Sequence, residues 1–363
     1  MASLTTASPN TTKIRPPVVP GMPLPELTSA NYTFNATPDT TLPASIAFGS
    51  VGVVKVKSLV SRQLSLKALD VAQQALNELF SAMKERGVAL EQGTKGGYAE
   101  IVQRSEGRYE MNYKMTQDLF ANSEFTDNVW LNEFVSNVMG GTASDGSWAL
   151  HRRSLLISFP GAKEQQWHVD GGHRTTSFHS SAHALNAFVA LGDISIDMGP
   201  TEIRPCSHYL SRKLFKFMML ARARKQLHSP VQPVASSGDA IIFDYRTLHR
   251  GTANNSDKPR AMLELVFFKK GFTDILNFPK RSIFDVNRES KDSGNRDEDD
   301  KDDKDDKDDK DDKDDKDNKD DKDDKDDKDT NKKDTNKKDT NKKDTNKDKD
   351  TIKDTDMDTI KDI

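Results

Sequence analysis

Three residues of this chain, His168, Asp170 and His249, are of the types that bind iron. His168 and Asp170 stand two positions apart in Trp167-His168-Val169-Asp170, so in a strand both side chains would leave the same face. His249 could complete the group from another strand. Two imidazoles and one carboxylate on one side of a metal form the facial triad of non-haem Fe(II) oxygenases, which leaves coordination positions open. The spacing therefore predicts an Fe(II) site at these three residues.

An arginine near the distal histidine could supply an anion site. Arg260 follows His249 by eleven residues, which is enough for a turn and a returning strand. The intervening residues 254–259 have the composition of a turn, and residues 261–268 resemble a strand. Because a guanidinium binds a carboxylate through two parallel hydrogen bonds, Arg260 is predicted to anchor a carboxylate.

A His-x-Asp pair alone is a weak signal, since a surface pair in a loop has the same sequence. The distribution of histidines strengthens it: all eight lie between His151 and His249. We therefore base the metal prediction on the combined pattern of ligands, arginine and turn, and not on the pair alone.

The 363 residues divide into three parts by composition. Residues 1–50 are rich in Ser, Thr, Pro and Asn and are expected to form a flexible arm. From Lys291 onward the chain is almost wholly Lys, Asp, Asn and Thr, with 22 basic and 32 acidic residues. Such a segment lacks the apolar side chains that offset the entropy of ordering, so residues 289–363 are expected to be a disordered tail. Residues 51–288 remain as one domain.

Several classes of protein are disfavoured by what the chain lacks. No run approaches the ~18 apolar residues of a membrane span, and residues 1–50 contain no apolar signal-peptide core. The single cysteine, Cys206, excludes an intrachain disulfide and favours a reducing, cytoplasmic location. The acidic tail, and the lack of aromatic residues among the basic ones, argue against nucleic acid as a partner.

Helices are expected mainly before residue 140 and strands after it. Apolar residues at intervals of three and four from Leu69 to Met83 predict an amphipathic helix ending near Gly87, and residues 125–139 predict a second one. Short strands are expected at residues 51–56, 98–103, 108–113, 153–159, 165–170, 185–191, 201–204, 240–243 and 261–268. This order favours an α+β fold whose strands form a sandwich or barrel, and a jelly roll fits.

A basic segment at residues 211–226 interrupts the strands. It contains six Lys and Arg residues, and no acidic residue occurs between Glu202 and Asp239. Two interpretations stay open. The segment is either the solvated face of a covering helix or a rim that attracts an anionic small-molecule substrate and governs substrate choice.

These residues resemble the phytanoyl-CoA dioxygenase family of Fe(II)/2-oxoglutarate oxygenases. The resemblance covers about residues 145–270. It implies a double-stranded β-helix, the cupin-like form of the jelly roll, flanked by N-terminal helices. It also implies that His168, Asp170 and His249 bind Fe(II), and that Arg260 binds the distal carboxylate of the cosubstrate 2-oxoglutarate. The pieces that carry the resemblance are Trp167 to Asp170, Gly199 to Glu202 leading to Pro205 to His208, Asp244 to Gly251, and Arg260.

One position departs from the family pattern. Many relatives have a serine two residues after the distal histidine, and its hydroxyl shares the 2-oxoglutarate carboxylate. Here that position is Gly251. Thr252 or Thr201 could supply a hydroxyl instead, and the sequence does not choose between them.

The resemblance implies an oxidoreductase that consumes O2 and 2-oxoglutarate, releases succinate and CO2, and oxidises a C–H bond, most simply by hydroxylating a small molecule. Two alternatives stay open. One is a peptide or protein hydroxylase, because the metal triad is common to both kinds of enzyme. The other is a non-catalytic binding protein on the same fold. The complete set of metal ligands argues against it, because such a protein would have no reason to keep them.

The charged tail generates the first prediction. Ending the chain after Arg288 should leave thermal stability and turnover near those of the full chain, because the removed residues cannot form a core. Thermal melting and succinate release would measure both. Loss of folding in the shortened chain would contradict the domain boundary.

Overall fold

The computed structural model of the protein describes residues 27–112, 123–174, 179–209, 228–274 and 278–285. The basic segment 211–226 and the tail 289–363 lie outside the described residues. The helices are α1 (Thr41–Val51), α2 (Arg62–Arg86), α4 (Ser123–Thr126) and α5 (Val129–Met139). The strands are β1 (Thr33–Asn35), β2 (Val53–Lys57), β3 (Ile101–Ser105), β4 (Arg108–Asn112), β5 (Trp148–Ser158), β6 (Ala184–Ala190), β7 (Thr201–Ile203), β8 (Ala240–Asp244), β9 (His249–Gly251) and β10 (Arg260–Lys269).

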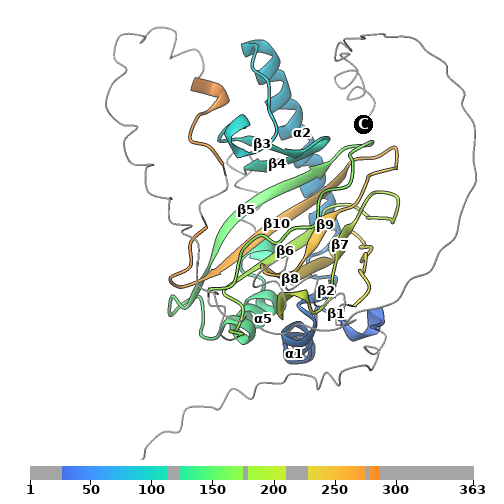
Figure 1. Ribbon diagram of the computed structural model, residues 1–363, viewed down its shortest axis with the longest axis vertical. Helices are drawn as coiled ribbons and strands as arrows, with labels where there is room; N and C mark the ends of the chain where they lie inside the picture. Colours follow the sequence, from blue (N-terminus) through green and yellow to red (C-terminus); the bar gives the residue numbers. More distant parts are fainter. Residues whose placement is uncertain (1–26, 113–122, 175–178, 210–227, 275–277, 286–363) are drawn as a thin grey trace, which may run out of the picture. The chain divides into compact units, whose positions relative to one another are not determined.

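Eight strands form one large sheet in the order β1-β2-β8-β6-β10-β5-β4-β3, and β7 and β9 form a second, two-stranded sheet (Figure 1). Strand β1 runs parallel to β2, and the other pairs are antiparallel. The protein therefore has a mixed α/β fold with a large sheet and few helices. Strand β10 lies near the centre of the large sheet, where it pairs with β5 on one side and β6 on the other.

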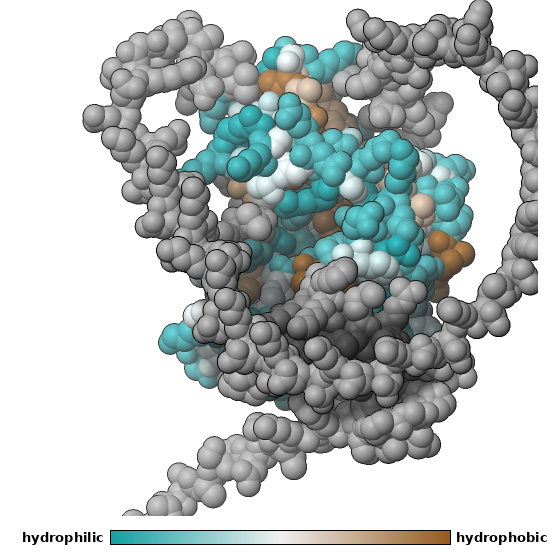
Figure 2. Space-filling model, viewed as in Figure 1, coloured by the Kyte–Doolittle hydropathy of each residue, from teal (hydrophilic) through white to brown (hydrophobic). Residues whose placement is uncertain are grey.

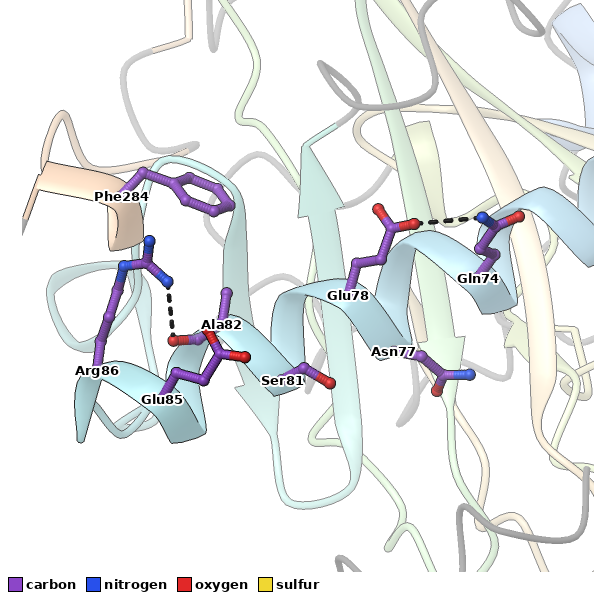
Figure 3. A pocket seen from close by; sticks show the side chains of 8 residues that line it. All are labelled: Gln74, Asn77, Glu78, Ser81, Ala82, Glu85, Arg86 and Phe284. Atoms are coloured by element: carbon purple, nitrogen blue, oxygen red, sulfur yellow. Dashed lines mark hydrogen bonds between the residues drawn. The ribbon is translucent and has the colours of Figure 1, made fainter.

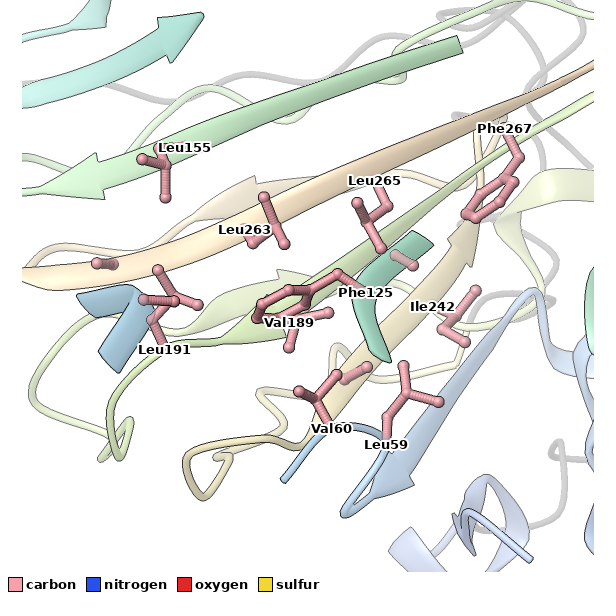
Figure 4. Packing of buried hydrophobic residues seen from close by; sticks show 14 of the residues in the cluster. Leu59, Val60, Phe125, Leu155, Val189, Leu191, Ile242, Leu263, Leu265 and Phe267 are labelled. Carbon is pink, nitrogen blue, oxygen red and sulfur yellow. The ribbon is translucent and has the colours of Figure 1, made fainter. Parts of the chain in front are cut away.

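Alternate residues of β10 serve opposite faces of the large sheet. Leu263, Leu265 and Phe267 are fully buried and belong to the larger hydrophobic core, which the sheet forms with the helices (Figure 4). Met262 belongs to a second core on the other face. Arg260 and Glu264 are in phase with Met262, so they leave the sheet on that second face.

Helix α2 is confirmed where the apolar spacing predicted it. It begins after Ser61, whose side chain accepts a hydrogen bond from the amide of Leu64, and ends at Gly87 in the left-handed conformation (φ 64°). Its buried face is built largely from alanines, such as Ala68 and Ala72, which let the helix lie close to the core.

The structure differs from the expected flexible arm at residues 27–50. Helix α1 packs against α5, where the rings of Phe48 and Phe134 meet edge to face with centroids 5.4 Å apart. Leu42 and Ile46 remain exposed in α1, so apolar residues lie on both of its sides. Without an amphipathic stripe among the Ser, Thr and Pro residues, the periodicity did not reveal this helix.

The described surface is mainly polar in the view of Figure 2, where hydrophilic residues predominate and brown residues are scattered. Over the residues that the structure describes, no helix has both the length and the apolar character to cross a membrane.

Phe48 provides a stability test of the N-terminal helix. Because its ring is buried against Phe134, Phe48→Ala should lower the free energy of unfolding by about 3–5 kcal/mol. The exposed neighbour Ile46 is the matched control, and Ile46→Ala should change it by less than about 0.5 kcal/mol. Chemical denaturation would measure both. Equal effects would mean that α1 does not pack as described.

Candidate metal centre

His168, Asp170 and His249 meet in space. One ligand atom from each residue lies within 4.8 Å of the other two. The Nε2 atom of His249 is 3.5 Å from Oδ2 of Asp170, and that of His168 is 3.9 Å from Oδ1. Two imidazole nitrogens and one carboxylate oxygen at this spacing fit a metal ion with open coordination positions.

The segment that carries His168 and Asp170 is not the strand that was expected over residues 165–170. It forms one isolated antiparallel bridge, in which His168 and His249 exchange two backbone hydrogen bonds of 3.0 Å. The amide of Gln165 donates to Gly251 and that of Asp170 donates to Tyr245. These hydrogen bonds are spaced unevenly along the two segments, so they do not form a regular ladder. Both His168 and Asp170 still reach one site. His249 lies on β9, so it completes the group from another strand.

Backbone carbonyls orient both histidine rings. Nδ1 of His168 is 2.8 Å from the carbonyl oxygen of Gln166, and Nδ1 of His249 is 2.9 Å from that of Thr247. A carbonyl can only accept, so each Nδ1 carries the proton and each Nε2 keeps its lone pair for a metal.

The third ligand, Asp170, is oriented by an amide. Asn186 of β6, which is fully buried, donates from Nδ2 to Oδ2 of Asp170 at 2.5 Å. Burial lowers the pKa of His249, although the charge of Asp170 opposes this. A neutral imidazole is the form that binds a metal.

A cavity of about 610 Å³ contains the three ligands and extends along the second face of the large sheet. Its walls combine apolar side chains with charged ones. The apolar part includes Leu156, Phe188 and Met262, and the charged part includes Arg108, Arg152, Arg260, Glu110 and Glu264.

Arg260 lies at the start of β10 and lines this cavity. It pairs with Ser158 of β5, and Arg108 of β4 pairs with the same serine, so the two arginines lie on one face of the sheet. Nη1 of Arg260 donates to the carbonyl of Gly199, while its buried Nε has no hydrogen-bond partner. Burial, followed by the like charge of Arg108, lowers the pKa of Arg260 to about 9.

Arg108 is the residue that the sequence did not reveal. It is buried, its Nη2 donates to the carbonyls of Thr252 and Lys163, and its Nη1 has no partner. Burial lowers its pKa to about 10. Among the described residues, no carboxylate forms an ion pair with Arg108 or Arg260. Two buried guanidiniums with free donors therefore face a cavity that can take an anion.

Gly251 stands against Arg108. A Cβ atom added to Gly251 would lie 2.7 Å from Nη1 of Arg108 and 2.7 Å from Oε1 of Gln165. Atoms do not pack that closely, so the guanidinium of Arg108 occupies the space that a larger residue would need. The departure from the family serine thus coincides with a second arginine.

The two threonines differ in position. Thr201 lines the cavity. Thr252 does not, and its hydroxyl donates to the carbonyl of Pro200 at 2.8 Å. The guanidiniums of Arg204 and Arg250 lie over the ring of Trp167, 4.9 and 4.6 Å from its centroid, and Trp167 is not part of the cavity wall.

A second hollow lies along α2 (Figure 3), and none of the three metal-ligating residues lines it. Gln74, Glu78 and Arg86 line it together with Phe284. It contains neither histidine nor aspartate, so the chemistry of the metal centre has no counterpart there.

Residues 52–262 match the phytanoyl-CoA dioxygenase family. The fold and the metal-ligating group agree with an Fe(II)/2-oxoglutarate-dependent oxygenase, and the chain belongs to this family. Fe(II) and 2-oxoglutarate, the cofactors that the sequence led us to expect, are those of the family.

Several solved structures resemble the chain at low identity. The non-haem α-ketoglutarate-dependent epimerase SnoN from nogalamycin biosynthesis is 16% identical, with a TM-score of 0.47 over 68% of this chain and 96% of its own. The carbocyclase SnoK from the same biosynthesis is 15% identical, with a TM-score of 0.46 over 73% and 93%. AviO1 from Streptomyces viridochromogenes Tue57 is 17% identical, with a TM-score of 0.45 over 64% and 97%. These similarities are distant, and the family assignment rests on the family match.

The contact between Gly251 and Arg108 can be tested by a double-mutant cycle. Gly251→Ala should cost about 1–3 kcal/mol of unfolding free energy, because the added methyl group displaces a buried guanidinium. In an Arg108→Ala background the same change should cost clearly less, and the difference is the coupling energy. Chemical denaturation of the four proteins measures it. Additive effects would show that the two residues do not compete for space.

Proposed function

We propose that the protein is an Fe(II)- and 2-oxoglutarate-dependent dioxygenase that hydroxylates a small molecule and releases succinate and CO2. One observation carries the proposal. The metal-ligating group and two buried arginines with unpaired donors share a single cavity, so a metal and a carboxylate can be bound side by side.

Each site residue has a role in this proposal. His168, Asp170 and His249 hold Fe(II) through two Nε2 atoms and a carboxylate oxygen. Arg260 receives the distal carboxylate of 2-oxoglutarate, and its free Nε–H can complete a two-pronged contact. When bound together, Fe(II) and 2-oxoglutarate supply the O2-dependent oxidation.

Arg108 takes the part that a serine hydroxyl has in many relatives. Its Nη1 carries a free N–H in the same cavity, beside Gly251. Thr201 lines the cavity and can add a hydroxyl. The hydroxyl of Thr252 already donates to Pro200, which makes it the weaker of the two candidates.

Apolar side chains on the same face shield this end of the cavity. Phe188 and Met262 belong to the second core and also line the cavity. By excluding water they strengthen the attraction between the arginines and a carboxylate, because charges interact more strongly where the local dielectric is low.

We also propose the finer topology and location. The large sheet and the β7–β9 sheet would form the two layers of a double-stranded β-helix, with the bridges His168–His249 and Ile203–Val231 extending the smaller layer. The free thiol of Cys206, the chain's single cysteine, suits a reducing compartment such as the cytoplasm.

Two variants separate the metal role from the cosubstrate role. His168→Ala should abolish Fe(II) binding and succinate formation, while the fold remains. Arg260→Ala should leave Fe(II) binding near normal and weaken 2-oxoglutarate binding by about 2–5 kcal/mol, more than about thirtyfold. Fe(II) titration and 2-oxoglutarate-dependent succinate release measure the two effects.

The exposed residue His151 is the matched control, and His151→Ala should change neither quantity. Full turnover of His168→Ala at limiting iron would overturn the metal assignment. An unchanged 2-oxoglutarate requirement in Arg260→Ala would overturn the anchor.

A further inference from the structure

The cavity has a second polar wall beyond the two arginines. Along β10, Glu264 lies four residues from Arg260, a distance of about 13 Å, and it faces the same side. Ser154 of β5 stands directly opposite Glu264. On β4, Glu110 lies two residues from Arg108 and therefore on the same face as it. Glu110 and Glu264 both line the cavity that holds the metal ligands.

Charges of opposite sign alternate along this wall. Nε of Arg104 donates to Oε2 of Glu110 at 2.6 Å. Oε1 of Glu110 lies 3.6 Å from Nε of Arg152, whose Nη2 donates to Glu264 at 3.3 Å. Two guanidiniums and two carboxylates therefore alternate along the wall.

The wall leaves hydrogen-bonding capacity unused. Oε1 of Glu110 and Nε of Arg152 are buried and face each other, yet neither has a hydrogen-bond partner. Ser154 and Arg152 both donate to one oxygen of Glu264, Oε2. Burial raises the pKa of Glu264 to about 7, against the opposing charge of Arg152. Glu110 and Arg152 thus form an ion pair that is too long for a hydrogen bond, and a small polar group between the two atoms could bond to both.

The two atoms without a hydrogen-bond partner, Oε1 of Glu110 and Nε of Arg152, favour one kind of ligand group. An acceptor on Glu110 and a donor on Arg152 stand 3.6 Å apart. An ammonium group can only donate and a carboxylate can only accept, so either would leave one of the two atoms unpaired. A hydroxyl group both donates and accepts. An acyl chain would leave both atoms unpaired, which is costly for buried polar groups.

We propose that this wall binds the hydroxyl groups of a neutral, polyhydroxylated small molecule, which is the substrate class of the enzyme. The inference rests on the proposed function, because it names the substrate of the same site. Glu110 and Arg152 hold one hydroxyl group between them, and Glu264 accepts from another. The substrate is thereby held in the cavity that contains the metal ligands, beyond the end that Arg260 and Arg108 reserve for 2-oxoglutarate.

The test uses the full chain with Fe(II), 2-oxoglutarate and O2. Succinate formation is compared with and without three sets of probes. The first set holds cyclitols, pentitols and aldohexoses; the second holds primary alkylamines and alkyl carboxylates; the third is hexadecanoyl-CoA. We expect members of the first set to stimulate succinate formation and to gain one oxygen atom by mass.

Stimulation by hexadecanoyl-CoA or the charged probes, or the lack of any stimulating polyol, would overturn the inference. If no polyol stimulates the enzyme but succinate forms without any probe, the proposed function still stands. Absence of succinate under every condition would instead count against the proposed function.

Variants of the wall give a second readout. Glu110→Gln keeps the shape but weakens the acceptor, so KM for the stimulating polyol should rise about tenfold or more, the loss of one hydrogen bond to a charged group. Ser154→Ala should act in the same direction through Glu264. The rise in KM should exceed any fall in kcat, which a merely structural role would not produce.

The control is Glu106→Gln, since Glu106 is exposed and pairs with the exposed Lys163. It should leave KM for the polyol unchanged. An unchanged polyol KM in both Glu110→Gln and Ser154→Ala would remove this wall from the substrate site.

Discussion

Two backbone hydrogen bonds between His168 and His249 hold the centre together. They fix the relative position of two segments that are far apart in the sequence, and each histidine ring is then turned by a carbonyl within two residues of it. Asp170 is tied to Tyr245 by its own amide, so the third ligand follows from the same pairing. Backbone atoms make these contacts, so among the neighbouring side chains described above only Asn186, which donates to the carboxylate of Asp170, orients a ligand directly.

The large sheet adds the second constraint. Because successive side chains of a strand point to opposite faces, a single strand can contribute to the core on one face and to the cavity on the other. On β10 the residues that face the helices are Leu263, Leu265 and Phe267, and they build the larger core. The residues in between, Arg260, Met262 and Glu264, line the cavity. Cross-strand pairing then aligns side chains from β4, β5 and β10 in rows, which brings Arg108 beside Arg260. A stable core and a polar cavity thus share the same strands.

Much of this could be predicted from sequence. The three proposed metal ligands were visible through residue type and order, and α2 through its period, because both signals are local. Arg108 could not be found, since it reaches the cavity through the register of β4 against β5, which no local pattern encodes. Glu264 did leave a signal: it is a carboxylate at an inward position of the apolar run 261–268. Helix α1 was missed because its exposed Leu42 and Ile46 mask its buried side.

The order of strands in the large sheet bears on how the chain is synthesised. Strand β2 pairs with β8, almost two hundred residues later, and β5 pairs with β10. During translation the early strands emerge long before the strands with which they pair. Until then their backbone groups lack their partners in the sheet. Long-range pairing of this kind slows folding and leaves strand edges open to aggregation. Since Arg260 and His249 are also made late, a nascent chain lacks part of the proposed site for Fe(II) and 2-oxoglutarate until most of the sheet has been translated.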